Sequence, residues 1–312
     1  MKVFGPIPSR RLGRSLGINN IPPKTCSYSC VYCQVGRTTK MQIEREKFYE
    51  PQEILFEVNK KINAAQKFNE PIDFLTFVPD GEPTLDLNLG NTIEQLKIFD
   101  IKIAVITNGS LLGRKNVQED LFKADLLSIK IDSVNEQVWR KINRPHHTLN
   151  LSKLFEDIDS FCQLFSGDLI TETMIVQDLN DSEESLKGIA SLIHWLEPTK
   201  AYLTIPTRPP AESGIEPPKN EVINKAFQIF NKKINDVELL TGYEGNDFTY
   251  TGDLEKELLS ILSVHPMRGD AMKSFLTKSD KGWSVLQKLL FEKKLVQVEY
   301  GGKEFYQRNF KR

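Results

Sequence analysis

The chain has little of several features that define common protein classes. Only four of its 312 residues are cysteine, which argues against a disulfide-stapled secreted fold. No apolar run approaches ~20 residues, so no membrane-spanning helix is expected, and the first residues lack the apolar core of a signal peptide. The formal net charge of −1 does not point to a nucleic-acid or membrane partner. These absences predict a cytoplasmic globular protein that has no membrane partner.

Three of the four cysteines fall within eight positions. Cys26, Cys30 and Cys33 stand in the run CSYSCVYC, which holds three soft thiolate ligands at short range. Such a loop can bind an iron–sulfur cluster or a zinc ion. Zinc would need a fourth ligand, which His146 or His147 could bring through the fold, and three close cysteines cannot all form disulfides. The remaining cysteine, Cys162, lies in a helical stretch and is expected to be a small core residue.

The cysteine run has a family resemblance. The spacing C-x3-C-x2-C, with Tyr32 directly before the last cysteine, resembles the signature of the radical S-adenosylmethionine (SAM) superfamily. The resemblance implies a [4Fe-4S] cluster on the three cysteines, with one open iron that binds S-adenosyl-L-methionine. It also implies reductive cleavage of SAM to a 5′-deoxyadenosyl radical that abstracts a substrate hydrogen. An electron donor of flavodoxin or ferredoxin type is then expected as a partner.

The middle of the chain alternates strand-like and helix-like segments, which is the pattern of a parallel sheet with crossover helices. Strands are expected over 17–21, 72–78, 102–107, 126–132, 169–176 and 201–205, and helices over 51–67, 116–124, 135–142, 151–165, 182–196 and 221–232. Six such units fit an α/β fold of the (β/α)6 partial TIM barrel type, which the resemblance also implies. The loops after the strands should then meet at one rim.

Further site candidates follow the expected strands. Asp80-Gly81-Glu82 resembles the Gly-Gly-Glu motif of the superfamily, with Asp80 in place of the first glycine. The resemblance implies that this segment lies along the methionine end of SAM, where a glycine permits close backbone approach and a carboxylate accepts from the ammonium group. The alternative interpretation is an Asp-Gly turn that ends a strand.

Five more residues are candidates for SAM contacts. By the resemblance, Tyr32 packs near adenine. Asn108 follows the third strand and Asn180 the fifth, while Ser128 and Lys130 share one face of the fourth. The alternatives are a turn at Asn108, a structural salt bridge for Lys130 and a helix cap near Asn180.

Two arginine-bearing segments resemble one subgroup of the superfamily. Arg10, Arg11 and Arg14 precede the cysteines, and Arg208 lies in TIPTRPP after the sixth strand. Arg208 is a candidate clamp for a substrate carboxylate or phosphate. Both segments resemble the stand-alone proteins grouped with wyosine-type tRNA-modifying enzymes. Those enzymes hold a second iron–sulfur cluster on extra cysteines, and only Cys162 is left over here. The radical condensation with pyruvate that they catalyse is therefore not expected of this chain.

The pattern changes after Gly245, which predicts a radical SAM barrel over 1–245 and a second domain over 246–312. The tail has helical spacing over 253–264, 268–276 and 281–294, then a hairpin around Gly301-Gly302. This order predicts a small winged-helix-like domain. Residues 251–312 contain 12 Lys and Arg against 8 Asp and Glu, a modest basic excess that favours nucleic-acid contact. Peptide contact and a purely structural role are the alternatives.

The sequence therefore predicts a radical SAM enzyme whose favoured substrate is RNA, in particular tRNA, contacted through the C-terminal domain. No catalytic residue beyond the cofactor site can be named from the sequence. A peptide or protein substrate is the alternative within the enzyme class. The alternative outside it is a non-catalytic zinc-binding regulator that binds nucleic acid.

Overall fold

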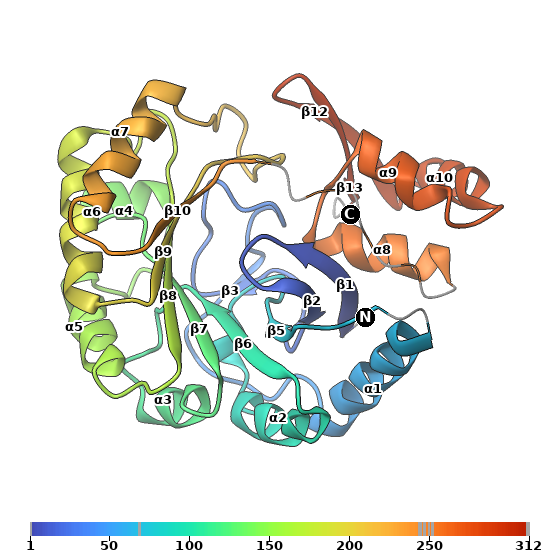
Figure 1. Cartoon of the computed structure of the whole chain (residues 1–312), viewed down its shortest axis with the longest axis horizontal. Coiled ribbons are helices and arrows are strands. Elements are labelled where there is room, and N and C mark those ends of the chain that lie inside the picture. Colours follow the sequence, from blue (N-terminus) through green and yellow to red (C-terminus); the bar gives the residue numbers. More distant parts are fainter. Residues whose placement is uncertain are drawn as a thin grey trace.

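A computed structural model describes residues 2–67, 70–242, 245, 248, 250 and 253–309. Its largest part is a single curved sheet with helices around the outside, and a smaller C-terminal unit lies beside one edge of that sheet (Figure 1). Among the described residues, no helix is long and apolar enough to cross a membrane.

The sheet has eight strands in the order β1-β2-β5-β6-β7-β8-β9-β10. Every neighbouring pair from β2 onward is parallel, whereas β1 pairs antiparallel with β2. The strand bounds are β1 Val3–Ser9, β2 Gly13–Ile18, β5 Phe74–Phe77, β6 Lys102–Thr107, β7 Leu126–Lys130, β8 Asp168–Met174, β9 Lys200–Thr204 and β10 Val237–Leu240. This topology confirms the predicted α/β partial barrel.

The crossover helices pack one apolar stripe each on the sheet. In α1, Ile54, Val58 and Ile62 are buried at helical spacing, as the sequence pattern predicts. Asn135, Asn150 and Ser182 cap α4, α5 and α6 by accepting from backbone N–H groups of the first turn. The helix bounds are α1 Pro51–Lys67, α2 Leu89–Leu96, α3 Lys115–Leu121, α4 Glu136–Ile142, α5 Leu151–Cys162, α6 Glu183–Leu196 and α7 Asn220–Asn231.

Four elements differ from the sequence prediction. The first parallel strand, expected over 17–21, runs over Gly13–Ile18, and neither β1 nor β10 was expected. Strand β1 was not predicted because Pro6 and Pro8 make its composition resemble that of a loop. They are tolerated because β1 lies at the edge of the sheet, where a missing N–H costs no ladder bond. Helix α2 was also missed.

The C-terminal unit has its own apolar core, which includes Leu258, Met272, Phe275 and Leu289. Its elements are α8 Leu254–Val264, β11 Met267–Arg268, α9 Gly269–Leu276, α10 Gly282–Phe291, β12 Leu295–Tyr300 and β13 Lys303–Arg308. The three strands form a sheet in the order β11-β13-β12. The expected hairpin is present, and its two turn glycines both have positive φ. The third helix ends at Phe291, earlier than residue 294.

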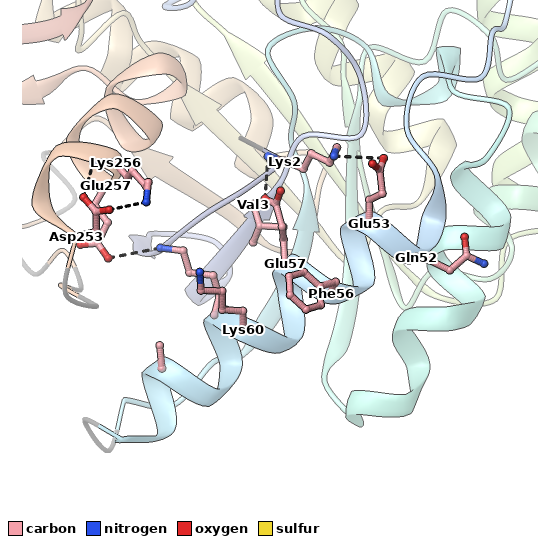
Figure 2. Close-up of a pocket in the computed structure, with 12 residues that line it drawn as sticks. Lys2, Val3, Gln52, Glu53, Phe56, Glu57, Lys60, Asp253, Lys256 and Glu257 are labelled. Atoms are coloured by element: carbon pink, nitrogen blue, oxygen red, sulfur yellow. Dashed lines mark hydrogen bonds and ion pairs between the residues drawn. The ribbon is translucent and has the colours of Figure 1, made fainter.

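Two of the contacts between the C-terminal unit and the barrel lie at α8 and at the end of β12. Helix α8 packs beside β1, and a groove of about 690 Å³ lies between α8 and α1 (Figure 2). Lys61 on α1 forms an ion pair with Glu257 on α8 at 3.6 Å across this groove. At the other place, the Tyr300 hydroxyl at the end of β12 lies 3.1 Å from the carbonyl oxygen of Ile215 and donates to it.

Candidate functional site

A cavity of about 250 Å³ opens at the carboxyl ends of the parallel strands. All three clustered cysteines line it, together with residues that end or follow β5, β6, β7, β8 and β9. The loops of a parallel barrel converge at this end, which is where barrel enzymes place their reactive groups. The cavity therefore gathers candidates that lie far apart in the sequence.

The cysteine loop is held by backbone contacts from both sides. At its start, β3 (Thr25–Cys26) pairs with β4 (Lys40–Met41). The segment after α4 lies beside the loop, because Tyr28 forms an isolated bridge with Pro145. The Ser29 backbone N–H also donates to the carbonyl oxygen of Asn143 at 3.1 Å. These contacts fix the loop between two segments that are distant in sequence.

Hydrogen-bond donors reach all three sulfurs, and at Cys33 they are the backbone N–H groups of Val35 and Gly36. The Tyr28 backbone N–H donates to Cys26 Sγ at 3.4 Å, and Asn143 Nδ2 donates to Cys30 Sγ at 3.4 Å. Burial raises the pKa of the Cys30 thiol to about 12 and raises the pKa of Cys26 and Cys33 as well. Such thiols are protonated at neutral pH, and a coordinated metal ion is what deprotonates a ligand thiol.

Glu82 is buried and heavily hydrogen-bonded. Its Oε1 accepts from both the backbone N–H and the hydroxyl of Thr84 and from the Thr107 hydroxyl at 2.7 Å. Its Oε2 accepts from the Asn108 backbone N–H at 2.8 Å. Burial still raises the pKa of this carboxyl, although each of these bonds acts to lower it. The side chain is thus fixed with one oxygen saturated and the other able to accept more.

The two residues before Glu82 are Asp80 and Gly81, and both are constrained by the fold. A Cβ placed on Gly81 would lie 1.8 Å from the carbonyl oxygen of Thr25, so only glycine fits between this segment and β3. Asp80 is buried on the cavity wall, and its Oδ1 has no hydrogen-bond partner among the described residues. Desolvation raises the pKa of Asp80 to about 7. A buried acceptor in this state is satisfied when a ligand supplies a donor.

Basic side chains line the wall near β1, β7 and β9. Lys130 Nζ donates to Glu172 Oε1 at 2.7 Å, and Arg11 pairs with the same carboxylate. Burial lowers the pKa of Arg11 to about 10 and also lowers the pKa of Lys130. Arg208 Nη1 donates to Gln34 Oε1 at 2.9 Å, and its Nη2 to His265 Nε2 at 3.1 Å. His265 belongs to the C-terminal unit, so that unit reaches the cavity rim.

The charges on the cavity wall do not balance. Five of its lining residues are cations and three are carboxylates, which leaves a surplus of two positive charges. Protonation of Asp80, whose pKa is about 7, would enlarge that surplus. The cations are Arg10, Arg11, Lys24, Lys130 and Arg208, and the carboxylates are Asp80, Glu82 and Glu172. Such a cavity attracts an anionic molecule.

The structure brings ten of the twelve predicted site residues to this cavity, namely Cys26, Cys30, Tyr32, Cys33, Asp80, Gly81, Glu82, Asn108, Lys130 and Arg208. Ser128 and Asn180 are not among its lining residues. Ser128 is fully buried on β7, one pleat before Lys130. Asn180 is buried too, and its Nδ2 donates to the carbonyl oxygens of Asp132 and Met174. The SAM contacts assigned to all these residues stay predictions.

Sequence reasoning missed three residues of this site. Arg11 was noted only within an arginine-rich segment, whereas Arg14 of the same segment turns away and pairs with Glu70. Glu172 was a polar residue in an apolar strand, a signal that was available. Asn143 gave no signal, because its approach to Cys30 depends on how the segment after α4 folds against the loop.

Comparison with known families agrees with this geometry. Residues 20–187, more than half of the chain, match the model of the Radical SAM superfamily. The chain belongs to the radical SAM superfamily. Membership makes it an enzyme of that class and implies use of a [4Fe-4S] cluster and SAM.

This radical SAM protein has close and distant relatives. It is 50% identical to the UPF0026 protein MJ1312 of Methanocaldococcus jannaschii over 310 residues, which cover 99% of this chain and 96% of that one. It is 21% identical over 218 residues to a probable dual-specificity RNA methyltransferase, RlmN 1, of Protochlamydia amoebophila. That match covers 67% of this chain and 57% of the methyltransferase, so it spans just over half of the relative.

Solved structures share the fold of this radical SAM protein. A radical SAM methyltransferase from Sphaerobacter thermophilus superposes with a TM-score of 0.56 at 16% identity, over 73% of this chain and 66% of that one. TYW1 with a lysine-pyruvate adduct bound superposes with a TM-score of 0.54 at 16% identity, over 71% and 74%. At these identities the likeness establishes the partial barrel and not the reaction.

The residues present fit the implied cofactors. Three thiols line one cavity, and the backbone at Gly81 has no room for a side chain. The buried Asp80 Oδ1 has no hydrogen-bond partner among the described residues. Within the described ranges, no group of three or more His, Cys, Asp or Glu side chains is close enough to hold a single metal ion. A four-iron cluster takes its cysteines one per iron, so its ligands are more widely spread.

Proposed function

We propose that this radical SAM enzyme holds a [4Fe-4S] cluster on Cys26, Cys30 and Cys33 and binds SAM beside it. The three cysteines on one cavity wall carry the proposal, because the fourth, Cys162, is the last residue of α5 and does not line that cavity. When bound, the cluster and SAM supply an electron and a 5′-deoxyadenosyl radical for hydrogen abstraction. The four free thiols suit the reducing cytoplasm, where we place the enzyme.

Two carboxylates would receive the ammonium group of SAM. Asp80 Oδ1 has no protein partner among the described residues, and Glu82 Oε2 accepts only the Asn108 N–H there. Carboxylate oxygens are strong acceptors for a cationic amine. Asp80 would therefore add a charged acceptor where the family pattern has glycine. Lys130 offers a cation for the SAM carboxylate, while Tyr32, Asn108, Ser128 and Asn180 remain candidates for the rest of the cofactor.

We propose RNA, in particular tRNA, as the substrate. The surplus of cations on the cavity wall favours a molecule that carries phosphates, and one relative is a probable RNA methyltransferase by name. The C-terminal unit, over about 246–312, would help to bind it. Its helix, strand, helix, helix, strand, strand order is that of a winged helix, a frequent nucleic-acid-binding unit.

Iron and sulfide analysis tests the cluster assignment. The anaerobically reconstituted enzyme is expected to bind about four irons with sulfide per chain. Cys30→Ala should lose the cluster, and Cys162→Ala is the matched control that should keep it. A single zinc ion per chain in place of iron would contradict the proposal and favour the non-catalytic regulator.

Filter binding of tRNA to the full chain tests the substrate class. Affinity should fall steeply as salt rises, because bound phosphates release counterions. Lys273→Glu and Lys281→Glu change exposed residues of the C-terminal unit and should weaken binding, while Lys232→Glu at the end of α7 is the charge-matched control. An affinity for tRNA that changes neither with salt nor with the C-terminal substitutions would count against this part of the proposal.

A further inference from the structure

Arg45 has a buried guanidinium group that none of the site assignments uses. Its side chain is only 4% exposed and forms an ion pair with Asp120 on α3. Arg45 is not among the residues that line the cavity in the described part of the chain. A buried ion pair adds little stability compared with apolar side chains of the same volume. The value of this pair therefore lies in what its guanidinium group holds in place.

The guanidinium group binds the backbone directly after Glu82. Residues Pro83–Leu85 form a short 3₁₀ helix that Glu82 caps at its N-terminal end. Arg45 Nε donates to the carbonyl oxygen of Thr84 at 2.9 Å, and its Nη2 donates to the carbonyl oxygen of Asp86 at 2.6 Å. The planar, forked guanidinium group can hold both oxygens at once, which a single ammonium group does less well. The short helix is thus held at the end opposite Glu82.

The other carbonyl oxygens of this short helix also accept from distant residues. Asn20 Nδ2 donates to the carbonyl oxygen of Pro83 at 3.0 Å and to Asp86 Oδ2 at 3.1 Å. The Glu46 backbone N–H donates to the carbonyl oxygen of Leu85 at 2.9 Å. The helix after Glu82 therefore has little freedom to shift while these contacts are intact.

The segment that carries Arg45 also holds the first cysteine. Strand β4 pairs with β3, which ends at Cys26, and the Gln42 backbone N–H donates to the carbonyl oxygen of Cys26 at 3.1 Å. Three residues later, Arg45 binds the short helix after Glu82. Residues 40–46 thus connect the backbone of Cys26 to the segment that positions the Glu82 carboxylate.

We propose that Arg45 is a positioning residue for SAM binding, which holds Glu82 at a fixed distance from Cys26 with the help of Asp120. SAM has to reach the cluster and the Glu82 carboxylate at the same time, and binding groups must be held to within about 0.5 Å for such a fit. Arg45 contacts neither SAM nor the cluster and acts only through the backbone after Glu82. This inference rests on the proposed function, because it needs SAM to bind between the cluster and Glu82.

Equilibrium dialysis of radiolabelled SAM against the reconstituted enzyme tests the role of Arg45. The cluster is kept oxidised, so SAM is bound but not cleaved and the readout is affinity rather than activity. In Arg45→Met the dissociation constant of SAM should rise about tenfold or more at unchanged iron content, because a charged hydrogen bond to Glu82 is weakened. Arg45→Lys keeps the buried charge, so it should fold even if Arg45→Met does not, and it should give a smaller rise.

Two further variants make the test specific. Arg14→Met is the matched control, because it removes an ion pair with Glu70 near the start of β2, away from the cavity, and should keep the wild-type affinity. Glu82→Gln removes the charge that the ammonium group of SAM would meet. In that background Arg45→Met should cost little further affinity, because the acceptor that Arg45 positions is already impaired.

The outcomes separate this inference from the proposed function. Wild-type enzyme that carries a full cluster but binds no SAM would overturn the proposed function and the inference with it. Wild-type SAM affinity in both Arg45 variants would overturn the positioning role alone and leave a structural ion pair. The same loss of affinity with and without Glu82→Gln would also overturn it, since Arg45 would then act independently of Glu82. Loss of iron in Arg45→Lys would overturn it too, because Arg45 would then hold the cysteine loop.

Discussion

At the scale of single residues, Asn143 connects a distant segment to the proposed cluster ligands. Its Nδ2 donates to Cys30 Sγ at 3.4 Å and to Asp132 Oδ2 at 2.7 Å. Asp132 in turn accepts from the Tyr32 hydroxyl. Hydrogen bonds to cluster sulfurs stabilise the more negative, reduced state and so raise the reduction potential. Asn143 is therefore expected to tune the cluster without contacting SAM.

Replacing Asn143 tests this role. Asn143→Leu should lower the cluster potential by about 20–60 mV, the equivalent of one hydrogen bond of about 1 kcal/mol for a one-electron couple. A redox titration followed by electron paramagnetic resonance measures the shift, with iron content confirming that the cluster is intact. Asn224→Leu, an exposed substitution on α7, is the control. An unchanged potential at full iron content would rule out the tuning role.

Asp80 should make the stability of the metal-free protein depend on pH. Its pKa is about 7 in the fold against the ordinary 3.8 of an aspartate carboxyl, so folded Asp80 holds its proton more tightly. The stability it contributes is complete below about pH 4 and is lost as pH rises through about 7. Asp80→Asn removes this loss. As pH rises from 4 to 8, the unfolding free energy of the variant should therefore increase by about 2–4 kcal/mol relative to that of wild type.

Denaturant unfolding at several pH values measures the Asp80 effect. Asp236→Asn changes an aspartate whose side chain is 52% exposed and should show no comparable trend. A constant difference between Asp80→Asn and wild type across this pH range would show that Asp80 titrates normally.

At the scale of elements, the site depends on how closely the segment after β5 packs on β3. The Glu82 backbone N–H donates to the carbonyl oxygen of Thr25 at 3.1 Å, and Gly81 leaves no space between the two segments. Cys26 follows Thr25 in β3. The position of the first cysteine is thus coupled to the position of the carboxylates.

Gly81→Ala tests this coupling. The added methyl group would lie 1.8 Å from the Thr25 oxygen, so the backbone must move. We expect a loss of about 1–3 kcal/mol in unfolding free energy, as for other overpacked positions, together with a lower iron content after reconstitution. Gly242→Ala is the control, because no heavy atom lies within 4 Å of the position that its added methyl group would take. Wild-type stability and iron content in Gly81→Ala would contradict the coupling.

The elements also show what the sequence can and cannot predict. Strands β5 to β9 and helix α1 were found because their apolar spacing is regular and short connections separate them. The edge strand β1 was hidden by its prolines. The contacts of Glu172 with Lys130 and Arg11 were not predictable, since they depend on strand register and on how the β1–β2 turn folds inward. In contrast, the three cysteines lie within one short segment, so their spacing could be recognised from the sequence alone.

At the scale of the whole molecule, the chain joins a partial barrel to a C-terminal unit that reaches the rim of the cavity. His265 of that unit accepts from Arg208, and the Val264 carbonyl oxygen accepts from Gln34 Nε2 at 2.8 Å. Gln34 directly follows Cys33. The C-terminal unit is therefore connected to both the Arg208 wall of the cavity and the cysteine loop, as its proposed role in binding the substrate requires.

Reductive cleavage of SAM is the reaction on which the proposed function rests. The most direct measurement is anaerobic reconstitution followed by dithionite and SAM, with 5′-deoxyadenosine scored by mass spectrometry against Cys30→Ala. We expect 5′-deoxyadenosine from wild type and none from the variant. A fully assembled, dithionite-reduced cluster that releases no 5′-deoxyadenosine, even with tRNA present, would contradict it.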